Sequence, residues 1–556
     1  MTLTFDERWI EGWRGPLIAA FIALMAGLPT LMTLGPLDRD ESRFAQASAQ
    51  MLETDDYVDI RFQEQPRHKK PVGIHWLQAA AVSLVSDVEN RDIRPYRIPS
   101  LLGAMLAAAA CAWGAGLAWG ARTGVIAGAL LGASFLLSSE AGIAKTDAML
   151  CASVTVAMAV LSRFYIAHRG GQPTPARPYK LALWGAIALG VLIKGPIILL
   201  VVGLTLAALG LWDRQWRWMK DLGWGWGLVI TALAVGPWAM AVTVRTDGAF
   251  WGTALGGDLF PKLVGGHERH GGWPGYYVFL APLLLFPATL LLPAGLITGW
   301  MRRSEPAVRF ALCWLIPTWI AFELFPTKLW HYTLPTFGAL AWLMALAVSE
   351  PLTTWGRRYG AILMLFGAVL VTALVGYGFS EFGGQADQVW AALTIGLALI
   401  GAGIASFFLL NRETHAAVVT ALAFGILTHT TLVQLLGGLG PLWTAPRLAE
   451  AIRQAGLHPM EGQAPGAVTL AGYSEPSAVF LLGTDTRLGD GADAARAVAG
   501  GRVAVVDQSQ QAAFNEEAQA LSMRPRPVAV VEGLNYSNGD PLRLSVYGPL
   551  TEAETQ

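Results

Sequence analysis

The feature that most constrains this chain is a series of long apolar segments separated by short polar connections. A helix needs about 20 apolar residues to cross the hydrocarbon core of a bilayer, which is ~30 Å thick. The chain is 54% hydrophobic and only 14% charged, whereas soluble domains carry about 25% charged residues. The sequence therefore predicts a polytopic α-helical membrane protein. We predict thirteen transmembrane helices, at 16–35, 98–118, 123–139, 147–166, 180–194, 196–211, 223–243, 276–300, 307–325, 330–348, 359–378, 389–410 and 414–438.

A further apolar segment, 72–87, is short, and we interpret it as a helix at the membrane interface. With that interpretation, the basic residues of most connections, such as Arg122 and Arg302, fall on one side. An excess of Lys and Arg marks the cytoplasmic side. The loops 36–97 and 244–275 and the C-terminal segment then lie on the outer side.

After Leu439 the composition changes to that of a soluble domain. The segment 444–456 is predicted as a helix, because Pro446 stands in its first turn and Gly456 at its end. Short strands are expected at 468–473, 478–483, 502–507, 527–533 and 542–548, with helices near 492–499 and 510–521. The sequence thus predicts a transmembrane domain over 1–438 and a soluble α/β domain over 439–556.

Charge and cysteine content exclude other classes. The net charge is −1, which gives no general attraction for nucleic acid. Cys111, Cys151 and Cys313 all lie within apolar segments. We therefore predict that they pack in the core and form neither a disulfide framework nor a metal site.

A dense group of charges, residues 38–75, follows the first apolar segment. Charges beside a membrane are costly, so they indicate a site for an anionic, lipid-borne substrate. Asp38 is a candidate cap of a helix that starts near Asp40, with Glu41 at capping-box spacing. Asp40 and Arg43 share a helix face. They could serve a sugar acceptor and a phosphate, or form a solvated cap and a surface ion pair.

The run Arg67-His68-Lys69-Lys70-Pro71 is a strong basic cluster. Lys and Arg are natural partners of phosphate oxygens. The alternative is an electrostatic anchor to anionic headgroups. That alternative is weaker on the outer leaflet, since the surface potential belongs to the cytoplasmic face.

Further polar residues on the outer side are candidates. Lys145 and Asp147 open a helix, where Asp147 could simply suit the helix dipole. Lys194 stands at a helix break before Gly195-Pro196, where a snorkelling lysine is the alternative to a ligand contact.

Another group, Lys328, His331 and Tyr332, enters a helix from the outer side. A cation, a histidine and a tyrosine there can meet a lipid headgroup. An aromatic belt at the membrane surface is the alternative.

The loop 244–275 holds His267, Glu268, Arg269 and His270. Two histidines flanking a glutamate could bind a metal. No second cluster at standard ligand spacing accompanies them, so we favour direct contact with phosphate or sugar. We predict no certain cofactor; a divalent metal is possible but not favoured.

Five motifs in this order resemble the bacterial GT-C glycosyltransferase family that includes the lipid A aminoarabinose transferases and the protein O-mannosyltransferases. The motifs are Asp40-Glu41-Ser42-Arg43-Phe44, Lys69-Lys70-Pro71-Val72, Lys145-Thr146-Asp147, Leu192-Ile193-Lys194-Gly195-Pro196 and Lys328-Leu329-Trp330-His331-Tyr332. The segment Gly472–Ser477 also resembles the periplasmic domain of that family.

The resemblance implies a polyprenyl-phosphate sugar donor, a lipid A-type glycolipid acceptor, and an active site on the periplasmic face of a bacterial inner membrane. The chain is expected to act as a monomer within the lipid bilayer and without nucleic acid. The expected catalytic residues are Asp40 and Asp147, the expected donor-phosphate ligands are Arg43, Lys70, Lys328 and His331, and the expected cavity residues are Glu41, Arg67, Lys69, Lys145, His267, Arg269, His270 and Tyr332.

One departure from the family pattern concerns the donor sugar. Lys69 stands where the family has a glutamate that contacts metal in some members. This departure argues against a metal and makes the expected pocket more basic. We therefore expect an anionic uronic-acid sugar or a neutral sugar, because extra cations would disfavour a cationic aminosugar.

Two other functions remain open from the sequence. A transferase of the same fold could glycosylate protein or a secreted polysaccharide. A transporter or lipid flippase would place charged residues and broken helices near the bilayer midplane, often in two related halves. Here the charges gather on one side and no halves repeat, which favours a transferase.

Overall fold

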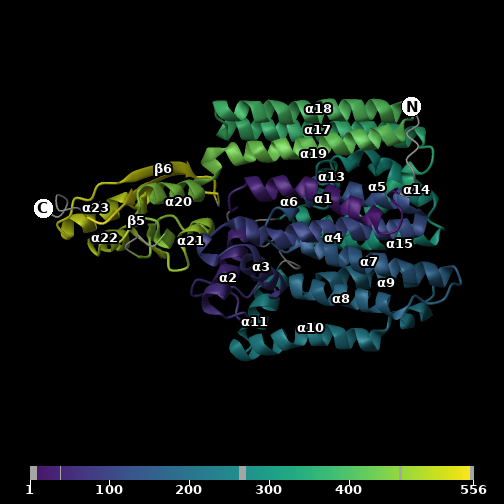
Figure 1. The fold of residues 1–556 in the computed structure, drawn as a ribbon, viewed down its shortest axis with the longest axis horizontal. Helices are drawn as coiled ribbons and strands as arrows, with labels where there is room; N and C mark the ends of the chain where they lie inside the picture. The colour runs from purple at the N-terminus through teal and green to yellow at the C-terminus, as the bar shows by residue number, and fades with distance from the viewer. Residues whose placement is uncertain (1–8, 38, 262–270, 462–465, 537, 551–556) are drawn as a thin grey trace.

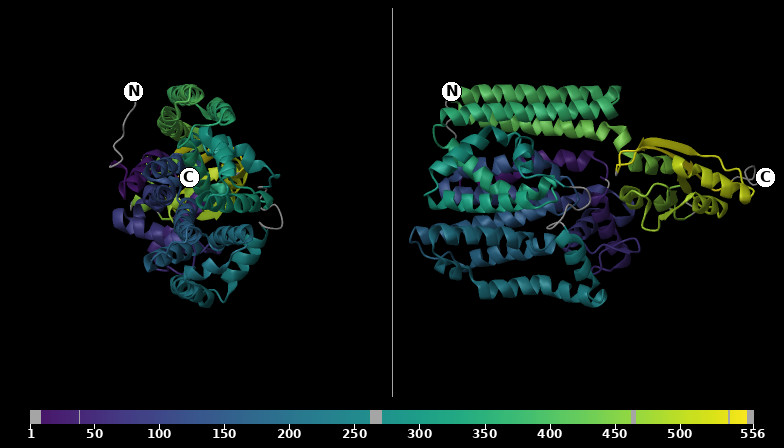
Figure 2. Two further views of the ribbon diagram at one scale, coloured as in Figure 1. Left: turned by 90° about the vertical axis from the view of Figure 1, so that its right-hand side faces the viewer. Right: turned by 180° about the vertical axis from the view of Figure 1, so that it is seen from behind.

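The helices of the membrane region lie roughly along one direction, and the C-terminal domain forms a separate lobe at one end of them (Figure 1). This computed structural model describes residues 9–37, 39–261, 271–461, 466–536 and 538–550. The helices α17, α18 and α19 line one side of the bundle, and α10 lies along the opposite side (Figures 1 and 2).

The elements of the membrane region are α1 (Arg14–Thr33), α2 (Asp40–Thr54), β1 (Arg61–Phe62), β2 (Gln65–Pro66), α3 (Gly73–Val85), η2 (Val88–Asn90), α4 (Ile93–Trp119), α5 (Ala121–Gly132), α6 (Phe135–Ala141), α7 (Asp147–Arg169), α8 (Arg177–Lys194), α9 (Ile197–Asp213), η3 (Arg217–Leu222), α10 (Trp224–Arg245), α11 (Ala249–Trp251), η4 (Gly252–Leu259), α13 (Tyr276–Leu284), η5 (Ala288–Leu291), α14 (Leu292–Met301), α15 (Pro306–Leu324), η6 (Trp330–Thr336), α16 (Phe337–Val348), α17 (Thr354–Phe382), η7 (Gln385–Asp387), α18 (Gln388–Leu410) and α19 (Thr414–Gly438).

Within the described residues, nine helical segments are long and apolar enough to cross a membrane. The number rises to 11 if each of two bent pairs is one span. These pairs are α5 with α6, bent by 65°, and α13 with the segment Ala288–Met301, bent by 115°. The structure therefore supports a polytopic helical membrane protein with fewer spans than the thirteen predicted.

The two remaining predicted spans correspond to α8 and α9. The helix α8 includes three basic residues, Arg177, Lys180 and Lys194, within 18 residues. The helix α9 has 17 residues. At 1.5 Å per residue, a helix of this length reaches only ~26 Å, which is short of the ~30 Å hydrocarbon core.

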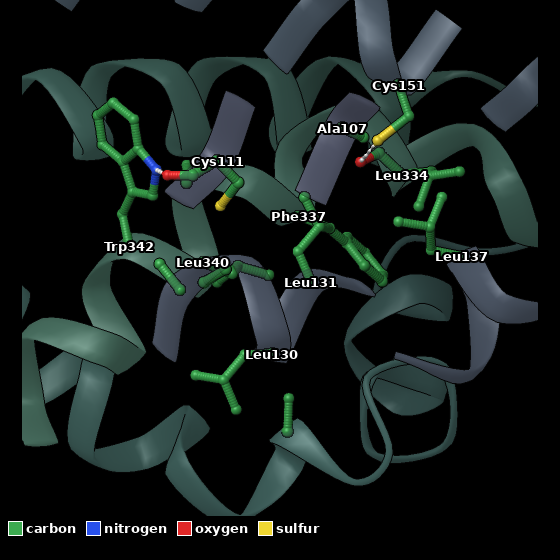
Figure 3. Close-up of a cluster of buried hydrophobic side chains, with 14 of the residues drawn as sticks. Ala107, Cys111, Leu130, Leu131, Leu137, Cys151, Leu334, Phe337, Leu340 and Trp342 are labelled. Atoms are coloured by element: carbon green, nitrogen blue, oxygen red, sulfur yellow. Dashed lines mark hydrogen bonds between the residues drawn. The ribbon is translucent and has the colours of Figure 1, made fainter. Parts of the chain in front are cut away.

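The helix α7 lies at the centre of the bundle, with 83% of its most apolar stretch buried inside the protein. It packs against α4 and α8. Near it, Cys111, Cys151 and Trp342 belong to one buried cluster (Figure 3). The indole Nε1 of Trp342 donates a hydrogen bond to the backbone oxygen of Cys111 at 3.0 Å. All three cysteines are buried and free, which confirms that they are packing residues.

Between α1 and α4 the chain leaves the bundle and forms α2, the β1–β2 hairpin and α3. The helix α3 has 13 residues, which span ~20 Å and are too few to cross a bilayer. This length agrees with the predicted interfacial helix. The segment thus brings α2 and the basic cluster that follows the hairpin to the end of the bundle nearest the C-terminal domain (Figure 1).

The C-terminal domain contains a five-stranded mixed sheet of order β4-β3-β5-β7-β6. The strands β4, β3 and β5 are parallel, whereas β7 is antiparallel to both β5 and β6. Its elements are η8 (Gly440–Leu442), α20 (Thr444–Gln454), η9 (Pro459–Glu461), β3 (Thr469–Ala471), α21 (Pro476–Leu482), β4 (Arg487–Gly489), α22 (Gly491–Ala499), β5 (Ala504–Asp507), η10 (Gln508–Gln510), α23 (Gln511–Ala520), β6 (Ala529–Leu534) and β7 (Pro541–Tyr547).

One strand prediction in this domain is wrong. The run 478–483 forms most of helix α21, which begins with Pro476 in its first turn. A short apolar run fits a buried helix as well as a buried strand, and a proline at the first helical position favours the helix. The strand β4 was not predicted.

Candidate functional site

The first turn of α2 faces the basic cluster. Asp40 is 66% exposed, and its Oδ1 lies 3.7 Å from Nη2 of Arg67. The Arg67 guanidinium lies over the ring of Phe44 at 4.3 Å, a cation–π contact that fixes its plane. Arg39 at the helix N-cap has a φ of 64° and no side-chain cap bond, and Asp38 lies outside the described residues. The structure thus brings Asp40 and Arg67 together, with Arg43 half-buried on the same helix.

Glu41 does not face an open cavity, contrary to the prediction. It is 2% exposed and forms a two-pronged ion pair with Arg97 of α4, with both N–O distances 2.8 Å. Its oxygens also accept hydrogen bonds from the backbone N–H groups of Leu37 and Ala144, at 2.8 and 2.7 Å. A buried carboxylate needs such complete pairing. Glu41 therefore ties α2 to α4 and to the turn before Lys145.

A cavity of about 450 Å³ opens beside this region. Its charged or ionisable lining residues are Lys69, Lys70, Lys194, Asp258 and His331. The rest of the lining is largely apolar or aromatic: Pro71, Leu150, Pro196, Ile197, Leu200, Phe250, Trp251, Ala254, Leu255, Phe322, Phe325, Tyr332 and Pro335. The cavity therefore combines a basic patch with an apolar wall.

Two lysines of the cavity have carboxylate partners. Nζ of Lys70 lies 2.7 Å from Oδ2 of Asp258. The Lys194 ammonium bonds to Asp147 and lies 5.7 Å from the ring centre of Tyr332. Lys194 ends α8 and Asp147 begins α7, so each charge also suits the dipole of its own helix. Gly195, with a φ of 64°, permits the break that follows Lys194.

Behind the cavity wall lies a second group of charges. Nζ of Lys145 contacts Oε1 of Glu140 at 3.0 Å, Oδ2 of Asp147 at 3.7 Å and Nδ1 of His331 at 3.3 Å. Burial disfavours the Lys145 ammonium, but Glu140 and Asp147 outweigh burial and raise the pKa of Lys145 above its usual value. Lys145 is therefore a permanent cation that holds His331 through its Nδ1.

The donor atoms of Glu140, Asp147 and His331 lie within 4.8 Å of one another, a spacing that could suit a metal ion. The ammonium groups of Lys145 and Lys194 already contact these carboxylates. Two cations neutralise the two carboxylates, so a divalent ion would meet like charge. The residues do not fit a metal well.

The environment of Lys328 does not match its predicted role as a phosphate ligand. Its Nζ donates to the backbone oxygens of Glu323 and Phe325, at 2.5 and 2.8 Å. It thereby caps the C-terminal end of α15, and it is not among the cavity residues. Burial lowers the pKa of Lys328, and Glu323 partly offsets this effect. The predicted residues His267, Arg269 and His270 lie outside the described residues.

Sequence reasoning did not select Glu140 and Asp258, and it left Lys194 undecided. Glu140 had a usable signal, because a carboxylate at the end of an apolar run costs free energy unless it is paired. Asp258 had none, since only the folded chain brings residue 258 to Lys70.

Comparisons with known proteins show what part of the chain resembles. Residues 41–249 match the family described as dolichyl-phosphate-mannose-protein mannosyltransferase. A protein of Pseudomonas paraeruginosa (strain DSM 24068 / PA7) is 30% identical over 344 residues, 61% of each chain. A protein of Yersinia pestis (strain Pestoides F) is 29% identical over 415 residues, 72% of each chain. Both relatives are named undecaprenyl phosphate-alpha-4-amino-4-deoxy-L-arabinose arabinosyl transferase.

The fold also agrees with solved structures. The structure of ArnT from Cupriavidus metallidurans bound to undecaprenyl phosphate superposes with a TM-score of 0.79 at 19% identity, covering 99% of both chains. The apo structure of ArnT gives a TM-score of 0.76 at 20% identity. The alignment with the Pseudomonas relative spans 61% of that protein's length. The fold is therefore that of ArnT.

Proposed function

We propose that this chain is a membrane glycosyltransferase that moves a sugar from undecaprenyl phosphate to a lipid A-type glycolipid on the periplasmic face of a bacterial inner membrane. The observation that carries the proposal is the cavity that joins lysine ammonium groups to an apolar wall. Lysine is suited to phosphate oxygens, and the wall suits the first isoprenoid units of the donor tail. The names of the relatives support the same donor, and the family match supports a lipid-phosphate sugar donor more generally.

The reaction is a substitution at the anomeric carbon. An acceptor oxygen forms the new bond while the bond to the polyprenyl phosphate breaks. Negative charge then grows on the leaving phosphate, and Lys70 and Lys194 stabilise it because they are already in position. Lys69, which lines the same cavity, adds a third positive charge.

Asp40 serves the acceptor in this proposal. It is exposed at the N-terminal end of α2 and lies near Arg67. An acceptor hydroxyl would be oriented by the carboxylate and would lose its proton late in the reaction. An acceptor phosphate needs no base, and the neighbouring guanidinium groups of Arg43 and Arg67 would hold it. Asp147 acts differently, since it fixes Lys194 and is 4% exposed.

The donor sugar that we propose is 4-amino-4-deoxy-L-arabinose, as in the names of the relatives. The sequence favoured an anionic or neutral sugar because Lys69 adds positive charge. Lys70 pairs with Asp258 and Lys194 pairs with Asp147. These carboxylates offset two of the three lysine charges, so the electrostatic argument against an aminosugar is weaker than the sequence alone indicated.

The transporter alternative finds less support. The broken pairs α5–α6 and α13–α14 are a feature that transporters share. The ion pairs of Lys70, Lys145 and Lys194, however, gather around one cavity beside α2, as expected for a site that receives a lipid headgroup.

Mass spectrometry of lipid A tests the proposal directly. Lipid A from a strain that lacks this gene is compared with lipid A from the same strain that carries it. We expect an added aminoarabinose only with the active gene, and its loss in Asp40→Asn and Lys70→Ala proteins that still reach the membrane. A new sugar on protein or polysaccharide, with lipid A unchanged, would mean that the acceptor is that protein or polysaccharide and not lipid A. If no new glycan of any kind is found, the proposed transferase function is rejected.

A further inference from the structure

We propose that one segment of the C-terminal domain, residues 480–486, is a positioning element of the transferase site. This inference rests on the proposed function and assigns a role to a domain that carries none of the charged residues of the cavity. The segment comprises the last residues of α21 and the turn after it, and it lies next to α2 of the membrane region (Figure 1). It contacts α2, the β1–β2 hairpin that precedes Arg67, and Ala144, which precedes Lys145.

The apolar part of the contact is Phe480. It is 0% exposed, although it belongs to the C-terminal domain, because it is buried among residues of the membrane region. Its neighbours in this buried cluster are Ala45 and Ala49 of α2, Val82 of α3, Ile93 and Tyr96 of α4, and Ala144. The Tyr96 ring meets the Phe480 ring edge to face at 5.4 Å. Burial of a phenylalanine is among the larger single contributions to an interface.

Three of these neighbours link Phe480 to the site. Ala45 and Ala49 stand on the helix whose first turn bears Asp40. Ala144 precedes Lys145 and donates its N–H to Glu41. Small side chains at these positions leave the space that the Phe480 ring fills. The ring therefore sets the distance between α2 and the turn that carries Lys145.

The polar part of the contact centres on Thr484. Its hydroxyl donates to Oε2 of Glu53 at 2.5 Å and accepts from Nε2 of Gln46 at 2.7 Å. Arg91 donates to Oε1 of Gln46 at 3.0 Å and to the Thr484 hydroxyl at 3.3 Å, and also forms an ion pair with Glu53. Because Gln46 and Glu53 are seven residues apart, they lie on the same face of α2. The segment thus forms hydrogen bonds with residues two turns apart on that helix.

A third contact reaches the hairpin before the basic cluster. Nε2 of Gln63 donates to the backbone oxygens of Thr484 and Thr486, at 3.0 and 2.5 Å. Gln63 also exchanges two hydrogen bonds with Gln50 of α2, at 2.7 and 2.9 Å. The hairpin continues into Arg67. One segment therefore fixes α2, the hairpin and the 144–147 turn relative to one another.

The cavity wall depends on other elements. The apolar lining comes mostly from α9, α11, η4, α15 and η6. None of these elements contributes a residue to the buried cluster that contains Phe480. Loss of the Phe480 contact should therefore misplace Asp40 and Arg67 more than it disturbs the donor site. Small misplacements of reacting groups can cost on the order of 100-fold in rate.

The test compares Phe480→Ala with Phe514→Ala in the purified full-length protein. Phe514 is a matched control, since it is 1% exposed in the same domain but stacks on Tyr547 within the domain's own core, with ring centres 4.4 Å apart. Transfer to lipid A gives kcat and KM, and undecaprenyl phosphate serves as the probe of donor binding. We expect Phe480→Ala to lower kcat at least about 10-fold, with the Kd for undecaprenyl phosphate changed less than about threefold. Phe514→Ala should keep kcat within about twofold.

The conservative pair at residue 484 gives a second readout. Thr484→Ser keeps the hydroxyl and should keep kcat, whereas Thr484→Val removes it and should lower kcat without changing donor binding. Equal losses of kcat in both phenylalanine variants would mean that the domain only needs to be folded, and would overturn the proposal. Weaker binding of undecaprenyl phosphate in step with kcat would overturn it too. A wild-type protein without transfer activity would instead reject the proposed function.

Discussion

At the scale of single residues, the cavity holds its cations ready by pairing them with carboxylates. The two pairs differ in the elements that carry the carboxylate. Lys194 and Asp147 lie at the ends of two helices and are held by the bundle. Lys70 pairs with Asp258, which lies in η4 of the 244–275 loop. The Asp258 carboxylate would therefore compete with a donor phosphate for Lys70.

This competition leads to a prediction for Asp258→Asn. The neutral amide should leave Lys70 available for the phosphate, so undecaprenyl phosphate should bind about fivefold more tightly, since such a pair is worth up to ~1 kcal/mol. Asp258→Glu keeps the charge and serves as the control. A binding titration with the purified protein measures both. Weaker binding in Asp258→Asn would mean that Asp258 orients Lys70 instead of competing for it.

A buried histidine makes the stability of the protein depend on pH. His75 of α3 stacks on Phe44, with ring centres 5.3 Å apart, and its Nδ1 lies 2.9 Å from the Ser48 hydroxyl. Burial, followed by the positive charge of Arg67, lowers the pKa of His75 to about 3. In the unfolded chain the pKa is ~6.5, so between these values only the unfolded chain binds the proton.

The free energy of unfolding should therefore fall as pH drops from ~6.5 towards ~3, by up to ~1.4 kcal/mol per pH unit from this group. His75→Gln does not titrate and should lose that part of the acid sensitivity. Thermal unfolding at pH 7 and pH 5 measures the difference. An equal drop in Tm in both proteins would show that other groups cause the acid sensitivity.

At the scale of elements, the sequence predicted the helices that have a clear residue periodicity and clear signals at their ends. The helix near Asp40 was predicted from its charge spacing, and α20 from Pro446 and Gly456. Where a run was short and uniformly apolar, as at 478–483, the pattern could not separate helix from strand. The pairing of Glu41 with Arg97 could not be predicted either, because 56 residues separate the partners along the chain.

That ion pair gives a prediction about how α2 is attached to α4. Arg97 also donates to the backbone oxygens of Leu34 and Gly35, at 2.6 and 2.7 Å. Removing one member of a buried pair costs about 3–5 kcal/mol. Arg97→Met should therefore destabilise the protein more than Glu41→Gln, since it also leaves those oxygens without their donor.

The control is Arg94→Ala on the same helix, where the Arg94 side chain is 53% exposed and pairs only locally with Asp92. It should leave Tm almost unchanged, because exposed pairs contribute little. Thermal unfolding of the three purified variants ranks them. A lower Tm for Glu41→Gln than for Arg97→Met would contradict the role assigned to Arg97.

At the scale of the whole molecule, the apolar runs identified every long helix of the described membrane region but not which of them cross. Nine helices satisfy length and composition, and 11 do so if the bent pairs count. Adding α8 and α9 gives the thirteen of the sequence. The excess over 11 comes from α8, which includes three basic residues, and from α9, which has only 17 residues. All of these counts are odd, so the start of α1 and the C-terminal domain belong on opposite sides of the membrane.

This parity predicts the orientation of the chain. Basic residues such as Arg122, Arg302 and Arg412 indicate that the start of α1 is cytoplasmic, so the C-terminal domain and the cavity beside it should be periplasmic. Alkaline phosphatase, which is active only outside the cytoplasm, should be active when fused after the last residue and inactive when fused within the 169–180 connection. A fluorescent protein that matures only in the cytoplasm should give the opposite pattern at the same two positions. An inactive phosphatase at the C-terminus would place Lys70 and Lys194 on the cytoplasmic face, where a lipid A acceptor displayed on the periplasmic leaflet could not reach them.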